Sequence, residues 1–414
     1  MRRGRSIERE RESIYTPSIL LLVVLVGVSF LGVGFIMPLR SIYGERVGAS
    51  PQEIGLMASA ALLTGFCFAP VAGWLTDRVG HRRVLWIGIL AHGFLVLAYI
   101  PAQNPLLLIG LRGLEGIAMA AILPPARALM NTIAPKSRQG EASGLLSSAQ
   151  MTGILLGPVL GTILASQVGY APSFLVASVP LFLAAISARL FLPAHAEEHA
   201  SHALAAASTA STGAPTLSSR LFSAPLLLVY GLCAALSLTN GVITAIWSIY
   251  MLKLGASLPV IGLSYTTYAI PTALLTPVVG RLSDRRGRFW PLLAGLLMYC
   301  GVYVVFGLGV SPLWMVLLSA VEGVPAAFSR VALDGFLADV TPSGARGKAQ
   351  ANYSAAGTFG SFIGATASGF LYRVSPGAPF LAVSVVFLAT AATLLVPSLA
   401  RLFPARAVAK ASVA

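Results

Sequence analysis

Charged residues are scarce in this chain. Only 10% of its 414 residues are Asp, Glu, Lys or Arg, whereas a soluble domain has about a quarter, and 56% are hydrophobic. So few charges cannot cover a water-exposed surface, which excludes an ordinary soluble globular protein. Apolar runs long enough to cross a bilayer recur instead, beginning with SILLLVVLVGVSFLGVGFIMPL from Ser18. We therefore interpret the chain as an integral membrane protein.

Cysteine and the common catalytic motifs are also scarce. Cys67, Cys233 and Cys300 fall within apolar spans and lack metal-ligand spacing, so we interpret them as packing residues. We find no Walker A sequence, hydrolase triad or metal-ligand cluster in the sequence. We therefore expect neither enzymatic activity nor a cofactor. An ion gradient or the gradient of the substrate itself must supply the energy for any transport.

Acidic residues are outnumbered, and the net charge is +14. A basic chain can indicate nucleic-acid binding, but here 21 of the 28 Lys and Arg residues lie in the N-terminus, alternate loops and the C-tail. This asymmetry is the positive-inside bias of a multi-pass membrane protein, so no nucleic-acid partner is expected. It predicts a plasma (inner) membrane protein with both termini in the cytoplasm. The opposite loops hold only four basic residues: Arg40, Arg46, Lys253 and Arg373.

Twelve apolar spans can be placed along the chain. We expect a six-helix bundle at 1–192, a cytoplasmic linker rich in Ala, Ser and Thr at 193–223, a second six-helix bundle at 224–400, and a cytoplasmic tail at 401–414.

The two halves are copies of one unit. GWLTDRVG begins at Gly73 and GRLSDRRG begins at Gly280, which is 207 residues later, and SIY at Ser41 recurs at the same offset at Ser248. Because each copy has an even number of spans, the two copies must have the same orientation in the membrane. The predicted fold is therefore an all-α integral membrane protein with twelve transmembrane helices in two parallel six-helix repeats.

The duplicated phrase joins the second and third spans of each half on the cytoplasmic side. Gly80 and Gly287 are expected to permit a tight turn, and Asp77 and Asp284 can face a neighbouring helix N-terminus. The phrase resembles motif A of the major facilitator superfamily. The resemblance implies alternating access by two bundles, and a cytoplasmic latch in which Asp77 meets the start of the eleventh helix and Asp284 that of the fifth. The predicted gate residues are Gly73, Asp77, Arg78, Gly80, Arg82, Gly280, Asp284, Arg285, Gly287, Arg288 and Asp339.

The two copies of the phrase differ in their supporting charges. The family pattern has a basic residue four positions after the Asp and an acid near the cytoplasmic end of the fourth or tenth helix. The second half keeps both, as Arg288 and Asp339, whereas the first half has His81 and Thr132. We therefore expect the second half to carry more of the latch.

A second resemblance concerns the fourth and fifth spans. LRGLEGIAMAA resembles motif B, with Arg112 as its arginine, and GILLGPVLGT resembles motif C of the drug/proton antiporters of this superfamily. Gly153, Gly157 and Gly161 lie on one helix face, where small residues permit close packing, and Pro158 adds a bend or removes a hydrogen bond. The resemblance implies export of drug-like compounds.

Two glutamates lie inside predicted spans. Glu115 should lie about 15 Å from the start of its helix, near the middle of the membrane, and Glu322 at the equivalent depth. Ionisable groups in hydrocarbon are costly and are therefore functional candidates, although static hydrogen bonds between helices would also explain them. We assign proton coupling to Arg112, Glu115 and Glu322, with Glu115 as the first candidate for the exchanged proton. His92 is expected to be a hydrogen-bonded contact between helices.

Polar and aromatic residues also cluster in the second half. Asn240, Tyr265, Tyr268 and Tyr353 are predicted to line a cavity for amphipathic or aromatic ligands. The predicted function is proton-coupled export of small amphipathic compounds by a monomer. Two alternatives stay open: a sugar or metabolite uniporter or symporter, and a non-transporting membrane receptor or scaffold.

Overall fold

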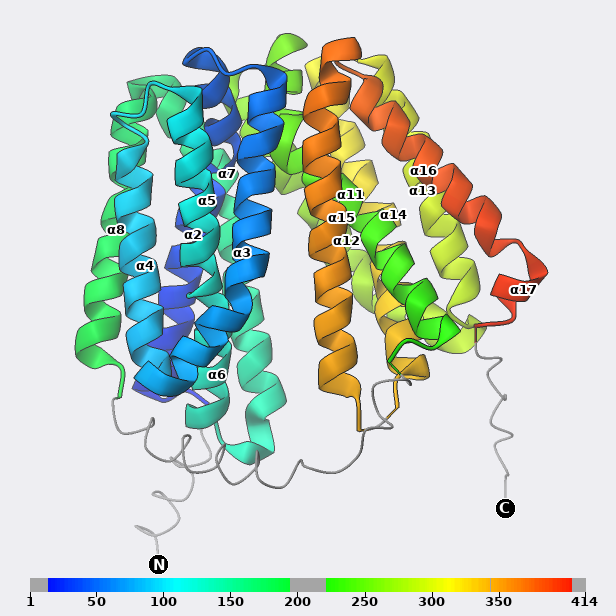
Figure 1. Ribbon diagram of the computed structural model, residues 1–414, viewed down its shortest axis with the longest axis horizontal. Helices are drawn as coiled ribbons and strands as arrows, with labels where there is room; N and C mark the ends of the chain where they lie inside the picture. Colours follow the sequence, from blue (N-terminus) through cyan, green and yellow to red (C-terminus); the bar gives the residue numbers. More distant parts are fainter. Residues whose placement is uncertain (1–13, 194–220, 343, 404–414) are drawn as a thin grey trace, which may run out of the picture. The chain divides into compact units, whose positions relative to one another are not determined.

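The computed structural model describes residues 14–193, 221–342 and 344–403 (Figure 1). Within these ranges every regular element is a helix. Ten helical segments are long and apolar enough to cross a membrane, and α15 (Arg346–Val374) and the shorter α16 (Ala378–Leu394) complete twelve. The predicted all-α membrane fold is confirmed.

The helices of the first half recur in the same order in the second. The first half contains α2 (Pro17–Arg46), α3 (Pro51–Val79), α4 (His81–Ala98), α5 (Pro105–Ala120), α6 (Leu123–Ile133), the short η1 (Lys136–Arg138), α7 (Gln139–Val168) and α8 (Tyr170–Phe191). The second contains α11 (Ala224–Lys253), α12 (Leu258–Arg286), α13 (Phe289–Leu308), α14 (Pro312–Val340), α15, α16 and α17 (Pro397–Ala400). Both α2 and α11 have 30 residues, and both α3 and α12 have 29, as expected for a duplication.

Local chemistry defines several helix starts. The Thr16 hydroxyl accepts the Ile19 amide at 3.4 Å, and Ser50 and Glu53 form a reciprocal capping box in which the carboxylate accepts the Ser50 amide at 2.7 Å. The Asn104 side chain caps α5 by accepting the Leu106 amide at 2.8 Å. A proline follows each of these caps, where its missing N–H costs no helical hydrogen bond.

Several helix boundaries differ from those predicted from hydropathy. Helix α2 continues to Arg46, so Arg40 lies inside a helix and not in a loop. Helix α3 continues to Val79, so most of the first duplicated phrase is helical rather than loop. The fourth span is broken between α5 and α6, just before Pro124 and Pro125, because proline cannot donate to the helical ladder.

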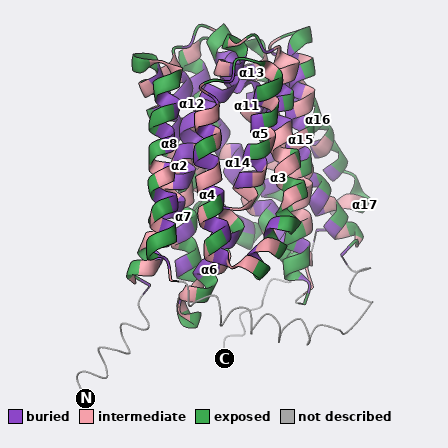
Figure 2. Ribbon diagram, turned by 60° about the vertical axis from the view of Figure 1, so that its left-hand side comes forward, coloured by how far each residue is buried: buried purple, intermediate pink, exposed green. Residues whose placement is uncertain are grey.

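The described chain forms two compact units. The first contains the residues up to 193 together with Thr244–Leu252 and Ala256–Thr266, and the second contains the rest. In the first unit α2 packs on α7 and α8, α3 on α5, and α4 on α8. In the second unit α13 packs on α14 and α16. Buried, intermediate and exposed residues alternate along each helix, as expected for helices with one packed face (Figure 2).

Candidate functional site

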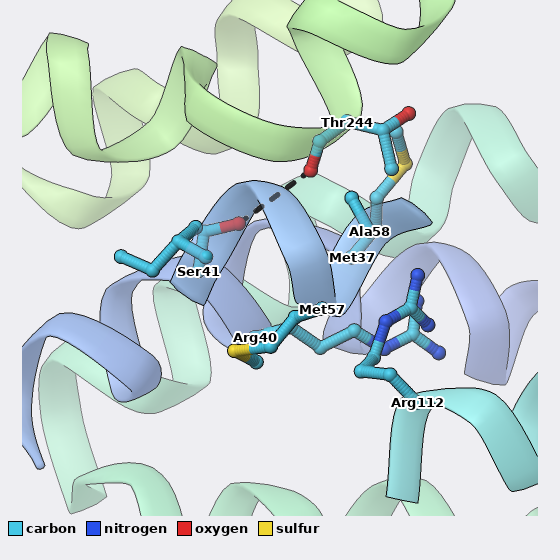
Figure 3. Close-up of a pocket in the computed structure, with 8 residues that line it drawn as sticks. Met37, Arg40, Ser41, Met57, Ala58, Arg112 and Thr244 are labelled. Atoms are coloured by element: carbon cyan, nitrogen blue, oxygen red, sulfur yellow. Dashed lines mark hydrogen bonds between the residues drawn. The ribbon is translucent and has the colours of Figure 1, made fainter. Parts of the chain in front are cut away.

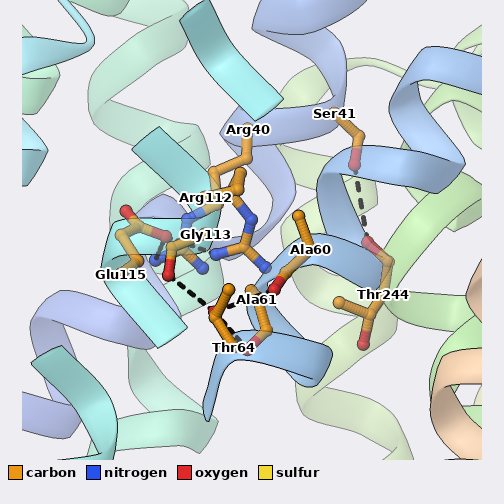
Figure 4. A network of polar contacts seen from close by, with 9 residues as sticks. All are labelled: Arg40, Ser41, Ala60, Ala61, Thr64, Arg112, Gly113, Glu115 and Thr244. Atoms are coloured by element: carbon orange, nitrogen blue, oxygen red, sulfur yellow. Dashed lines mark hydrogen bonds and ion pairs between the residues drawn. The ribbon is translucent and has the colours of Figure 1, made fainter. Parts of the chain in front are cut away.

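A buried cluster of two arginines and one glutamate lies in the first unit. Glu115 is only 1% exposed and contacts the guanidinium of Arg112, one turn earlier on α5. Arg40 reaches the same carboxylate oxygen from α2, with its Nη2 3.1 Å from Oε2 (Figure 4). We call these three residues the Arg–Glu–Arg cluster. Arg112 and Glu115, which the sequence interpretation assigns to one function, are in contact, and Arg40 is a partner that it did not assign.

Small residues hold α5 against α3 beside this cluster. The Thr64 hydroxyl of α3 donates a hydrogen bond to the Gly113 carbonyl at 2.6 Å (Figure 4). A Cβ atom at Gly116 would collide with the Ala61 carbonyl and the Thr64 side chain. Only glycine permits this close approach, which positions the neighbouring Glu115 within the unit.

Helix α4 and the residue that follows its last turn supply two further buried polar groups. His92 and Tyr99 are fully buried, and both interact electrostatically with Glu115. Neither ring nitrogen of His92 has a hydrogen-bond partner in the described chain. The prediction that His92 is a hydrogen-bonded contact between helices is therefore wrong.

The two arginines of the Arg–Glu–Arg cluster border a small cavity. Its volume is about 10 Å³ (Figure 3). The residues that line it are Met37, Arg40, Ser41, Ile54, Met57, Ala58, Arg112 and Thr244. A drug-sized ligand needs about 300–1,000 Å³, so this cavity can hold only a water molecule or a small ion.

Glu322, at the equivalent depth in the second unit, has different surroundings. It lies on α14 and is 6% exposed, and it accepts a hydrogen bond of 2.9 Å from the Tyr303 hydroxyl of α13. The Tyr299 ring lies 5.9 Å from the Tyr303 ring, and Tyr268 also interacts with the carboxyl group. No ion pair to Glu322 occurs within the described ranges. Glu322 therefore has neutral phenols as neighbours, whereas Glu115 has two guanidiniums.

The gate residues of the second unit form a three-member charge bridge. Arg288 lies between α12 and α13, with Nη1 2.7 Å from Asp284 Oδ1 and Nε 3.0 Å from Asp339 Oδ2. The turn before it requires Gly287, whose φ is +86°. Desolvation lowers the pKa of Arg288, but its hydrogen bonds to the two carboxylates outweigh that effect, so the pKa is raised. These contacts tie the ends of α12 and α14 together.

The first copy of the gate is held differently. Gly80 forms the equivalent turn with a φ of +99°, and Arg82 donates hydrogen bonds to main-chain carbonyls at the end of α8, including that of Arg189. The Arg78 guanidinium lies over the Trp74 ring, 4.4 Å from its centroid. Thus the first copy uses carbonyl and aromatic contacts where the second uses two carboxylates.

The remaining gate residues make few contacts within their own units. Asp77 and Arg285 are exposed. A Cβ atom at Gly73 would meet no atom within 4 Å, and one at Gly280 would lie 3.9 Å from Val331. The contacts of Asp77 and Asp284 with the other half therefore stay predictions.

A model of one transporter family matches this chain twice. The description of that family is Major Facilitator Superfamily, and the matches cover residues 22–246 and 232–412. The chain belongs to the Major Facilitator Superfamily.

Relatives within the superfamily are distant. An uncharacterized MFS-type transporter of Methanocaldococcus jannaschii is 27% identical over 83% of this chain and 88% of its own length. The multidrug resistance protein MdtG of Enterobacter lignolyticus is 28% identical over 67% of this chain and 68% of its own length. The crystal structure of the nucleoside transporter NupG superposes with a TM-score of 0.72 over 93% of this chain and 100% of that one, at 14% identity, and shows a shared fold.

The glycines of the superfamily's motif C pack helix α7 against α2. A Cβ atom at Gly153 would lie 2.6 Å from the Gly27 carbonyl oxygen, and one at Gly157 would lie 2.5 Å from the Phe35 amide nitrogen. A Cβ atom at Gly161 would meet the Phe35 backbone as well. The three glycines therefore share one face, as predicted from their spacing, and that face is occupied by a neighbouring helix.

The same close approach occurs in the second unit. There Gly360 and Gly364 on α15 pack against Ala234 and Leu238 on α11. This half lacks the buried Pro158 of the motif and still makes the contact. Close packing by glycine is therefore common to both halves of this superfamily member and does not by itself indicate an exporter.

The four predicted substrate residues fall in different units. Tyr265 is half-buried in the first unit, where its hydroxyl lies 2.9 Å from the Ser248 hydroxyl. Asn240, Tyr268 and Tyr353 belong to the second unit. Asn240 donates to the Ser361 hydroxyl of α15 at 3.2 Å. Tyr353 donates to the Asp334 carboxylate of α14 at 2.8 Å. The joint role of the four in binding substrate stays a prediction.

A larger hollow on the first unit is apolar. A groove of about 600 Å³ lies over α3, α4 and α5, and its lining includes the exposed side chains of Ile87, Phe94 and Leu114. It lacks the few convergent polar groups typical of a specific ligand site. In a membrane protein such a face is suited to lipid chains.

Proposed function

We propose that this chain is a proton-coupled exporter of small amphipathic compounds. It would work by alternating access as a monomer in the inner membrane, with both termini in the cytoplasm. Membership of the Major Facilitator Superfamily supports transport of a small molecule. The similarity to proteins named for multidrug resistance supports export. The observation on which proton coupling depends is the environment of Glu322.

Glu322 is the residue that we assign to the exchanged proton. A buried carboxylate that lacks a cation is costly, and a proton removes that cost by neutralising the group. The structure places the neutral hydroxyl of Tyr303 at 2.9 Å and no cation within ion-pair distance in the second unit. Binding and release of one proton would therefore change the charge of the site by a full unit during the transport cycle.

Glu115 is less suited to that task. Its carboxylate contacts both Arg40 and Arg112, so protonation would leave two buried guanidiniums without a counterion. We therefore propose that Glu115 remains ionised and joins α2 to α5 throughout the cycle. This reverses the order of the two glutamates in the sequence interpretation, which made Glu115 the first candidate for the exchanged proton.

The charge bridge in the second unit supports a gating role. Arg288 contacts carboxylates from the ends of α12 and α14 at 2.7 Å and 3.0 Å. We propose that this bridge orders the end of the second bundle that takes part in the cytoplasmic latch. Breaking the bridge would then change the balance between outward-facing and inward-facing states and leave the buried core intact.

The test uses inverted membrane vesicles, in which an exporter accumulates its substrate. We expect an acid-inside pH gradient to drive accumulation of at least one member of a panel of lipophilic cations and neutral dyes, and collapse of the gradient by nigericin to abolish it. Vesicles without the protein are the control. Proton-driven movement in the opposite direction, or flux independent of protons, would favour a symporter or uniporter. Absence of any flux across a broad panel would favour a receptor or scaffold.

A further inference from the structure

The Arg–Glu–Arg cluster carries more positive than negative charge. Arg40 and Arg112 are 7% and 8% exposed, and both contact one oxygen of Glu115. With that carboxylate ionised, the three residues carry a net charge of +1 in the interior of the unit. Uncompensated charge in such a place is costly, so a bound anion would be stabilising.

One donor of the cluster has no acceptor. The Nε atom of Arg40 is buried and has no hydrogen-bond partner in the described chain. Buried donors in proteins are almost always paired with protein, water or a bound ligand. Arg40 also lines the cavity of about 10 Å³ (Figure 3).

The cavity lining suits a negative ligand. Arg40, Arg112 and the Ser41 hydroxyl can donate hydrogen bonds, and no Asp or Glu lines the cavity. The other lining groups are aliphatic or thioether side chains and Thr244, whose carbonyl accepts from Ser41 at a long 3.5 Å. The volume admits one small ion or one oxygen atom of a larger ligand, and excludes a whole drug-sized molecule.

We propose that the cavity between Arg40 and Arg112 is an anion-binding site for a halide or for one acidic oxygen of an organic ligand. This inference goes beyond proton-coupled export, which assigns these arginines no ligand. If the oxygen belongs to a transported compound, the inference rests on the proposed function and adds acidic amphipathic compounds to its substrates. Binding itself can be measured without transport, so the two proposals can fail separately.

The first experiment measures thermal unfolding of the purified full-length protein in detergent. Unfolding is compared in a gluconate buffer and in a chloride buffer of the same ionic strength, since gluconate is too large for the cavity. We expect chloride to raise the unfolding temperature by roughly 2 °C or more, because a ligand that binds only the native state stabilises it. Arg40→Gln should lose this response. Arg46→Gln, which removes an exposed arginine from the same helix, should keep it. An equal response of wild type and Arg40→Gln, or no response of wild type, would overturn the proposal.

A second measurement does not depend on the folding of any variant. Chloride NMR line broadening by the wild-type protein should be relieved by formate and not by gluconate. Absence of broadening, or broadening that formate does not relieve, contradicts the site. Benzoate and its neutral amide then distinguish the two sources. Displacement of chloride by formate and by benzoate, but not by the neutral amide, supports an organic acid group, and displacement by formate but not benzoate supports a free inorganic anion.

Discussion

Replacing Glu115 with glutamine should destabilise the protein far more than the same replacement of Glu141. Both residues follow an arginine by three positions, in the pairs Arg112–Glu115 and Arg138–Glu141. The side chains of the first pair are 10% and 1% exposed, and those of the second are 39% and 48% exposed. The two substitutions are therefore chemically identical and differ in burial.

The expected magnitudes follow from that difference. Removing one partner of a buried ion pair costs about 3–5 kcal/mol, because the remaining charge stays buried. An exposed pair contributes about 0–1 kcal/mol. Because Arg40 also depends on Glu115, the Glu115→Gln variant leaves two buried guanidiniums without a carboxylate. Its cost should lie at the upper end of the first range.

The assay is reversible unfolding of the purified variants in mixed detergent micelles, read as the free energy of unfolding. A second replacement provides an internal check, since adding Arg40→Gln to Glu115→Gln removes one of the two unpaired charges and should recover part of the lost stability. A Glu115→Gln variant as stable as Glu141→Gln would refute the buried-charge reasoning. The reasoning would also be refuted if Arg40→Gln destabilised the wild-type protein and the Glu115→Gln variant equally.

Three further outcomes can be checked separately. Gly157→Ala should destabilise the protein by about 1–3 kcal/mol in the same unfolding assay, because its Cβ would lie 2.5 Å from the α2 backbone. The control is Gly144→Ala on the same helix, which faces open space and should be neutral or slightly stabilising. Asp284→Asn should impair transport more than Asp77→Asn, because Asp284 belongs to the Arg288 bridge; equal flux in vesicles would contradict this. A cysteine placed at Ser211, in a cysteine-free background, should be shielded from an impermeant thiol reagent in intact cells, and labelling from outside would reverse the predicted orientation.

The helical architecture could be predicted from the sequence because apolar runs and the spacing of repeated residues can be read directly along the chain. The starts of α2 and α11, at Pro17 and Ala224, are 207 residues apart, which is the offset of the duplicated phrase. The turns at Gly80 and Gly287 also follow from residue type, since both have positive φ values.

The partners of the buried charges could not be predicted in the same way. Arg40 follows the end of an apolar run, so hydropathy placed it in a loop, although α2 continues to Arg46 and carries it to Glu115. The partner of Glu322 is Tyr303, on a neighbouring helix, and no periodicity along one helix identifies a contact between two. The two glutamates therefore look equivalent in the sequence and differ once their neighbours are known.

The central claim is that Glu322 carries the exchanged proton. Its most direct test is substrate transport by Glu322→Gln in proteoliposomes, with folding checked by thermal unfolding. We predict that the variant loses accumulation driven by a pH gradient and retains exchange of substrate down its own gradient, because exchange needs the conformational cycle but no proton release. A well-folded Glu322→Gln protein that still concentrates substrate in response to the pH gradient would contradict the account.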